Sequence, residues 1–145
     1  MKFLSFWILC LLFVLTACGS PREGVELRVS AKSLEGVATV EVLVIESTLK
    51  SGEPTTCSDL LDGTYKVDKK NFTVKESGSV KIDSNDSQEL VLNKLSLGER
   101  LFLALAYEEK DGAQRIALFG CKEERVRPGQ KTFVSLGLSD FQGAQ

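Results

Sequence analysis

The sequence predicts an all-β domain, an antiparallel β-sandwich or a small barrel of about seven to nine strands. Turn signals rich in Gly, Asp, Asn and Ser return about every 8 to 12 residues after residue 24. Between them, apolar and polar residues alternate with the period of two that places one face of a strand in a core. No stretch in this region has the period of a long helix.

The strands are expected in order between these turns. Val25, Leu27 and Val29 alternate with charged residues, which is typical of a strand with one solvated face. Gly78 is expected to turn the chain between two short strands. The remaining strands are expected at residues 37–46, 65–67, 71–75, 80–82, 88–95, 100–109, 114–121 and 131–138.

The strand at residues 100–109 is the most apolar of the set. One face carries Leu101, Leu103, Leu105 and Tyr107, and the other carries Phe102, Ala104 and Ala106. A strand that is apolar on both faces belongs in the interior of a sheet. The Asp111-Gly112 pair that follows predicts a tight hairpin into the next strand.

The first 17 residues have the order of a bacterial export signal. Lys2 gives a positive start, residues 3–15 are almost unbroken apolar sequence, and Leu15-Thr16-Ala17-Cys18 places two small residues before a cysteine. At these four positions the chain resembles the lipobox of bacterial lipoproteins. The resemblance implies cleavage before Cys18 and a lipid on its thiolate. An uncleaved membrane helix, for which the run falls short of about 20 residues, and an ordinary secretory signal are the alternatives.

The domain organisation follows from this assignment. We expect a cleaved signal helix at residues 1–17, the lipidated Cys18 with a short tether at 18–24, the β domain at 25–139 and a loose tail at 140–145. In enterobacterial lipoproteins an Asp after the cysteine favours inner-membrane retention, so Gly19 implies by resemblance an outer-membrane location, on the periplasmic or surface face. Residues 92–136 loosely resemble the closing strands of prealbumin-like or immunoglobulin-like bacterial surface domains.

Residues 47–63 interrupt the strand pattern with Gly52, Pro54 and Cys57. Residues 58–61 could form one helical turn, capped by Ser58 or Thr56. In an exported protein the remaining pair of cysteines, Cys57 and Cys121, is expected to form a disulfide. Two separately buried thiols are the alternative.

The composition offers little catalytic chemistry. The chain has no histidine, so the commonest general base and metal ligand are missing, and its formal net charge of −2 does not favour nucleic acid. Glu108-Glu109 and Glu123-Glu124 are neighbours on strands and point to opposite faces. Residues 83–89 carry side-chain oxygens at alternate positions, which a calcium ion would accept. A plain polar turn is the favoured interpretation of this segment. We expect no catalytic residues, metal or cofactor.

These observations predict a non-enzymatic cell-envelope lipoprotein, a structural or protein-interaction subunit. It would contact the membrane through the lipid on Cys18 and an envelope protein through residues 47–63 or 122–130. The alternative is a small-ligand carrier, a closed barrel in which Phe102, Ala104 and Ala106 line a cavity.

Overall fold

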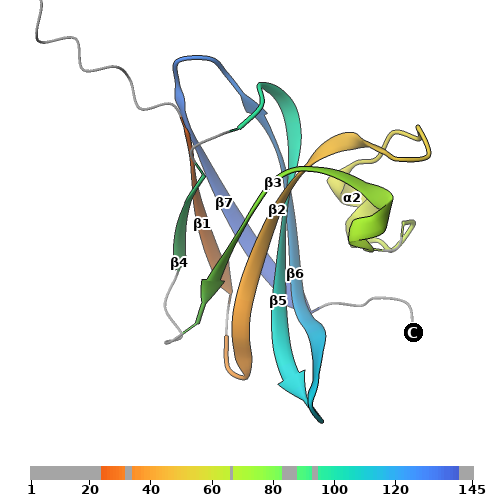
Figure 1. Ribbon diagram of the computed structural model, residues 1–145, viewed down its shortest axis with the longest axis vertical. Coiled ribbons are helices and arrows are strands. Elements are labelled where there is room, and N and C mark those ends of the chain that lie inside the picture. Colours follow the sequence, from red (N-terminus) through yellow and green to blue (C-terminus); the bar gives the residue numbers. More distant parts are fainter. Residues whose placement is uncertain (1–23, 32–33, 66, 83–87, 93–94, 141–145) are drawn as a thin grey trace, which may run out of the picture.

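The computed structural model describes residues 24–31, 34–65, 67–82, 88–92 and 95–140. Strands make up most of this part of the chain (Figure 1). In chain order the elements are β1 (Gly24–Ala31), β2 (Val37–Leu49), the short helix α2 (Cys57–Leu61), the 3-10 turn η2 (Lys69–Asn71), β3 (Phe72–Lys81), β4 (Gln88–Leu92), β5 (Gly98–Lys110), β6 (Ala113–Val126) and β7 (Lys131–Asp140). The prediction of an all-β domain is confirmed.

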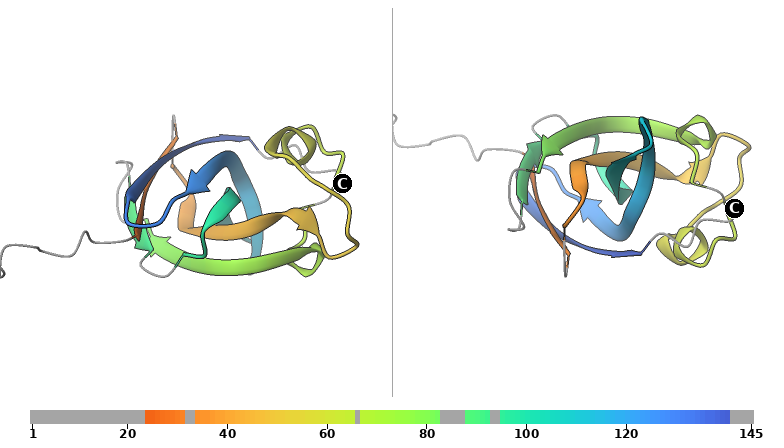
Figure 2. Two further views of the ribbon diagram at one scale, coloured as in Figure 1. Left: turned by 90° about the horizontal axis from the view of Figure 1, so that it is seen from above. Right: turned by 90° about the horizontal axis from the view of Figure 1, so that it is seen from below.

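The seven strands form one sheet in the order β3-β2-β5-β6-β7-β1-β4. Seen along the strands, the sheet curves until its two edge strands, β3 and β4, approach each other (Figure 2). The result is a nearly closed barrel made of one rolled sheet, so of the two expected arrangements the small barrel is closer to the structure than the two stacked sheets of a sandwich.

The sheet is mixed, so the expectation of an antiparallel arrangement throughout is wrong at one pair. β1 runs parallel to β7, with Gly24 opposite Lys131 and Ala31 opposite Leu138. All other neighbouring pairs of the order are antiparallel. A parallel pair needs a long connection between its strands. Here the whole rest of the domain provides it, because β1 and β7 are the first and last strands.

Gly78 does not turn the chain, which corrects a second expectation. Two strands were expected at residues 71–75 and 80–82. Residues 72–75 and 80–81 belong to the single strand β3, and residues 65, 67, 71 and 82 lie outside any strand. A Cβ at Gly78 would lie 2.8 Å from Cδ2 of Leu90 in β4. The glycine therefore allows the two edge strands to approach, a role that sequence cannot distinguish from a turn.

The barrel interior holds one hydrophobic cluster, which we call the interior cluster. Its side chains alternate along β1, β2, β5 and β7, as the period of two requires. Its buried members include Val25, Leu27, Val29, Val40, Val42, Val44, Leu92, Phe102, Ala104, Ala106, Val126, Val134, Leu136 and Leu138. Full burial of each large side chain contributes about 1.5–3 kcal/mol, so this cluster is the main source of stability.

A second cluster, the outer cluster, lies on the outside of β2, β5 and β6. The segment that contains α2 and η2 covers it, on one side of the barrel (Figures 1 and 2). Its buried members are Leu43, Ile45, Leu49, Cys57, Leu60, Phe72, Leu101, Leu103, Leu105 and Phe119. β5 is thus buried on both faces, as predicted. The cover explains why: one face looks into the barrel and the other lies beneath residues 57–65 and 67–72.

The hairpin between β5 and β6 also confirms a prediction. Lys110 lies opposite Ala113, and the two residues between them have positive φ, 55° at Asp111 and 75° at Gly112. Two adjacent left-handed residues define the tight turn that the twist of paired strands favours. This hairpin lies at the opposite end of the barrel from the start of β1 (Figure 1).

Candidate functional site

A surface pocket of about 450 Å³ lies where the segment after β2 meets the β5–β6 ribbon. Residues 47 and 54–56 form one side, and residues 99–101 and 123–125 form the other. Residues 47–63 and 122–130 were the two candidate interaction segments of the sequence analysis, and the structure brings parts of both together. The second segment is not all loop, because β6 continues to Val126.

The first wall of the pocket is a tight excursion of the chain that returns to β2. The amide of Leu49 donates to the carbonyl of Glu53 at 2.8 Å, and the amide of Thr55 donates to the carbonyl of Ser47 at 3.0 Å. Gly52 supplies the left-handed backbone at the tip, with φ of 93°. These bonds fix the position of Thr55 relative to β2.

The same wall is fastened to β6 by the start of α2. Thr56 caps the helix: its side chain accepts from the amide of Asp59, whose carboxylate accepts from the amide of Thr56 at 2.8 Å. The predicted helical turn and one of its two proposed caps are therefore confirmed. The amide of Cys57 donates to Oε1 of Glu123 at 2.8 Å. The structure also joins Cys57 to Cys121, with Cα atoms 5.4 Å apart.

Thr55 is the most unusual residue of the pocket. It is only 2% exposed, and its hydroxyl has no hydrogen-bond partner among the described residues. A buried hydroxyl without a partner costs about 1–3 kcal/mol. Thr55 lines the pocket, and although its hydroxyl oxygen has almost no exposed surface in the free protein, a hydroxyl that becomes accessible can both donate and accept. Sequence reasoning missed it, since nothing in the pattern marks this threonine as buried.

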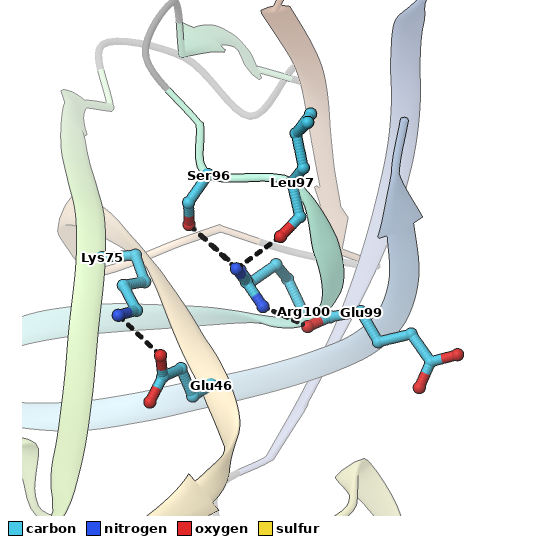
Figure 3. A network of polar contacts seen from close by, with 6 residues as sticks. All are labelled: Glu46, Lys75, Ser96, Leu97, Glu99 and Arg100. Carbon is cyan, nitrogen blue, oxygen red and sulfur yellow. Dashed lines mark hydrogen bonds and ion pairs between the residues drawn. The ribbon is translucent and has the colours of Figure 1, made fainter. Parts of the chain in front are cut away.

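The second wall carries charges of both signs. In the register of the ribbon, Glu99 lies opposite Arg125 and Arg100 opposite Glu124. The Arg100 guanidinium is already engaged: it donates to Oγ of Ser96 at 3.1 and 3.2 Å and to the carbonyls of Leu97 at 2.5 Å and Glu99 at 2.7 Å (Figure 3). Arg100 therefore holds the chain that leads into β5.

A neighbouring ion pair lies close to Arg100 (Figure 3). Nζ of Lys75 lies 2.5 Å from Oε1 of Glu46. The hydrogen bond from Lys75 holds the pKa of Glu46 below its ordinary value, and the Lys75 and Arg100 charges add to the effect. By strand alternation, Glu46 continues the face of Val44, which belongs to the interior cluster. These charges thus lie at an end of the barrel interior.

Another polar group holds η2 against the barrel. The hydroxyl of Tyr107 donates to Oε2 of Glu41 at 3.0 Å, Lys69 forms an ion pair with the same carboxylate, and its Nζ lies 5.7 Å from the Tyr107 ring centroid. Burial, followed by the bond to Glu41, raises the pKa of the Tyr107 hydroxyl. All three contacts occur within the fold, so we assign the group a structural role.

The other predicted residues are divided between the pocket, the β5–β6 hairpin, the barrel interior and the part of the chain outside the described residues. Glu108 lies opposite Arg115 near the hairpin, whereas Glu123 lies opposite Leu101 toward the other end of the ribbon, so the two acidic pairs are not brought together. Phe102, Ala104 and Ala106 have no exposed surface and pack in the interior cluster. Cys18 and residues 83–87 lie outside the described residues.

Two kinds of feature are absent from the described residues. No cluster of three or more His, Cys, Asp or Glu that could hold a metal occurs among them. None of the helices in that part of the chain has both the length and the apolar content needed to span a membrane.

Comparison with known proteins yields no match to a family model, to a curated protein or to a solved structure. The fold and the pocket define this chain as a nearly closed β-barrel domain whose largest irregular segment is fastened to the barrel by a disulfide beside an open pocket.

Proposed function

We propose that this chain is a non-enzymatic lipoprotein of the bacterial cell envelope that binds another envelope protein through the pocket beside the disulfide. The lipid on Cys18 would anchor it, with Gly19 favouring the outer membrane. The lipobox sequence supports the proposed location, and the unpartnered hydroxyl of Thr55 supports the proposed binding role of the pocket. A relation to prealbumin-like or immunoglobulin-like surface domains is part of the same proposal, supported by the all-β content alone.

The construction of the pocket supports a binding role. One wall is held to β2 by backbone hydrogen bonds and to β6 by the Cys57–Cys121 bond and the Cys57–Glu123 contact. Preorganised walls reduce the entropy lost when a partner binds. Burial of the Thr55 hydroxyl destabilises the folded protein, because no hydrogen bond within the fold compensates for the lost contact with water. A partner that hydrogen-bonds to this hydroxyl would offset that destabilisation.

The charges of the pocket indicate what kind of partner segment would fit. The lining carries three carboxylates, on Glu99, Glu123 and Glu124, and two guanidinium groups. Arg100 uses four of its five N–H donors on residues 96–99, although its positive charge remains. Three carboxylates against two guanidinium groups leave the lining acidic by one charge, which favours an extended polar segment of the partner that carries a basic side chain.

Replacing Thr55 with valine separates binding from stability. Thr55→Val exchanges the unpartnered hydroxyl for a methyl group of nearly the same size, so we expect the free energy of unfolding to rise by about 1 kcal/mol. Partner binding should weaken at the same time, because the wall loses its hydrogen-bonding group. Urea denaturation measures the first effect and competition binding the second. Thr55→Ser, which keeps the hydroxyl, is the control for binding.

Photo-crosslinking in intact cells identifies the partner. A crosslinking residue at Arg125, exposed on the rim of the pocket, should capture one protein. The same residue at Gln114, exposed on the same strand at the hairpin end, should not capture it. Thr55→Val should reduce the Arg125 product. Equal capture at both positions, or an Arg125 product that Thr55→Val leaves unchanged, would exclude the pocket as the interface.

A small polar ligand is the second candidate occupant. The volume of about 450 Å³ lies in the range of small-molecule sites, about 300–1,000 Å³. This moves the carrier hypothesis from the barrel interior, where Phe102, Ala104 and Ala106 are fully packed, to the surface. A small molecule that co-purifies with the parent and is lost from Thr55→Val, without any protein crosslink at Arg125, would favour this function.

A further inference from the structure

The two outer faces of the barrel differ in what covers them. Residues 57–65 and 67–72 cover the outside of β2, β5 and β6, where the outer cluster lies. On the outside of β4, β1 and β7, two large apolar side chains are exposed: Phe133 at 65% and Val91 at 47%. Both lie opposite Glu26 in the strand register, so they flank it on the same face. We call Val91, Glu26 and Phe133 the exposed row.

The exposed row lies near the point where the chain leaves the domain toward Cys18. Glu26 is the third residue of β1, about 7 Å along the strand from its first residue, Gly24. Residues 19–23 connect Gly24 to Cys18, so a fully extended chain allows about 20 Å between the lipidated sulfur and the start of the barrel. If Cys18 carries lipid, the exposed row is held within reach of the bilayer surface.

Leu97 is a third exposed apolar side chain at this end of the barrel. It is 53% exposed and comes directly before β5, whose first residue, Gly98, lies opposite Val126 of β6. The start of β5, the connection from β6 to β7 and the start of β1 all lie at one end of the barrel (Figure 1). Arg100 holds the carbonyl of Leu97, and the Leu97 side chain points away from this network (Figure 3).

The charges around the exposed row suit a lipid headgroup region. Lys131 pairs with Glu26, and its Nζ lies 5.1 Å from the centroid of the Phe133 ring. A cation over a ring face is attracted to it, and a lysine can extend its ammonium to the polar surface while its stem lies along apolar surface. Phe and Leu are among the side chains that segments lying in this boundary bury on their apolar face. The ion pair neutralises the local charge, so contact with lipid does not require an anionic membrane.

We propose that the barrel rests against the bilayer through the end that carries the exposed row and Leu97, with Phe133, Val91 and Leu97 at the boundary between headgroups and acyl chains. The proposal rests on the lipid anchor at Cys18, because a contact of three side chains needs the tether to keep it near the surface. It goes beyond the anchor by fixing the orientation of the domain. The occupant is a lipid surface, and a second copy of the chain is the competing occupant.

A tryptophan reporter tests this orientation. The only tryptophan, Trp7, lies in the segment expected to be removed, so a Phe133→Trp chain that starts at Cys18 has a single reporter. The chain is coupled through the Cys18 thiol to a maleimide headgroup lipid in phosphatidylcholine vesicles. This supplies the tether whether or not the cell acylates Cys18, so the test is independent of the proposed function. The matched control is Gln114→Trp, which lies opposite Glu109 beside the β5–β6 hairpin. This hairpin is at the other end of the barrel (Figure 1).

Brominated phosphatidylcholine provides the measurement. Apolar side chains of interfacial segments are buried about 5–10 Å into the region between headgroups and acyl chains. Brominated acyl chains would therefore contact the tryptophan at position 133, and we expect its quenching to be at least about twofold stronger than that of the control. Leu97→Trp should behave like Phe133→Trp, which guards against one variant failing to fold. Equal quenching at positions 133 and 114 would overturn the proposal. A blue shift at position 133 that grows with protein density, without quenching by brominated lipid, would assign the face to a second copy and also overturn it.

Discussion

A Cys57→Ala, Cys121→Ala variant is expected to lose about 4 kcal/mol of the free energy of unfolding. The bond closes a loop of 64 residues, and the chain-entropy relation for that length gives this value. Domains of this size have about 5–15 kcal/mol in total, so the loss is a large share. Urea denaturation of the variant and of the parent, with a reductant added to the parent as the control, measures it.

Loss of the bond should also open the pocket before the barrel unfolds. Cys57 is the point at which the cover of the outer cluster is joined to β6, and Glu123 holds the same residue only by a hydrogen bond. Proteolysis in residues 50–56 should therefore become faster in the variant while the barrel stays folded. A variant within about 1 kcal/mol of the parent would contradict the loop-closure account.

Gly120→Ala is expected to destabilise the barrel by about 3 kcal/mol, at the upper end of the usual cost of overpacking. A Cβ at Gly120 would overlap the carbonyl oxygen of Gly137 in β7 and lie 3.0 Å from Cδ2 of Leu138. The overlapping atom belongs to the backbone of β7, so the overlap can be removed only if β6 and β7 move apart. These strands pair directly only at Leu118–Asp140 and Phe119–Ser139, next to this contact.

Gly137→Ala is the matched control, on the other side of the same crossing. A Cβ at Gly137 meets nothing within 4 Å, and its φ is not positive. We expect its unfolding free energy to lie within about 0.5 kcal/mol of the parent. Urea denaturation of both variants gives the comparison. Equal effects at the two glycines would show that the crossing of β6 and β7 does not have this geometry.

The features predictable from sequence were the local ones. The alternation along residues 100–109 indicated a strand buried on both faces, and Asp111-Gly112 indicated the hairpin. Both depend on residues close in sequence, where the period of two and the need for positive φ apply directly. The pairing of Cys57 with Cys121 required only a count of cysteines.

The features missed were those set by contacts between distant strands. Parallel pairing of β1 with β7 depends on how the sheet closes, and alternation is the same for either direction. Gly78 was assigned to a turn because composition cannot distinguish a glycine that bends the chain from one that lets Leu90 approach. The pocket itself is formed by residues far apart in sequence, because its walls come from residues 47 and 54–56 on one side and 99–101 and 123–125 on the other.

The most direct test of the account is the mass of the mature N-terminus. We predict an N-terminal peptide that begins at Cys18 and carries the added mass of a diacylglyceryl group. The Cys18→Ser protein should carry no lipid and should be absent from the membrane fraction. An unmodified Cys18 in the parent, with Cys18→Ser distributed between fractions like the parent, would contradict the lipid anchor and with it the proposed place of this protein in the envelope.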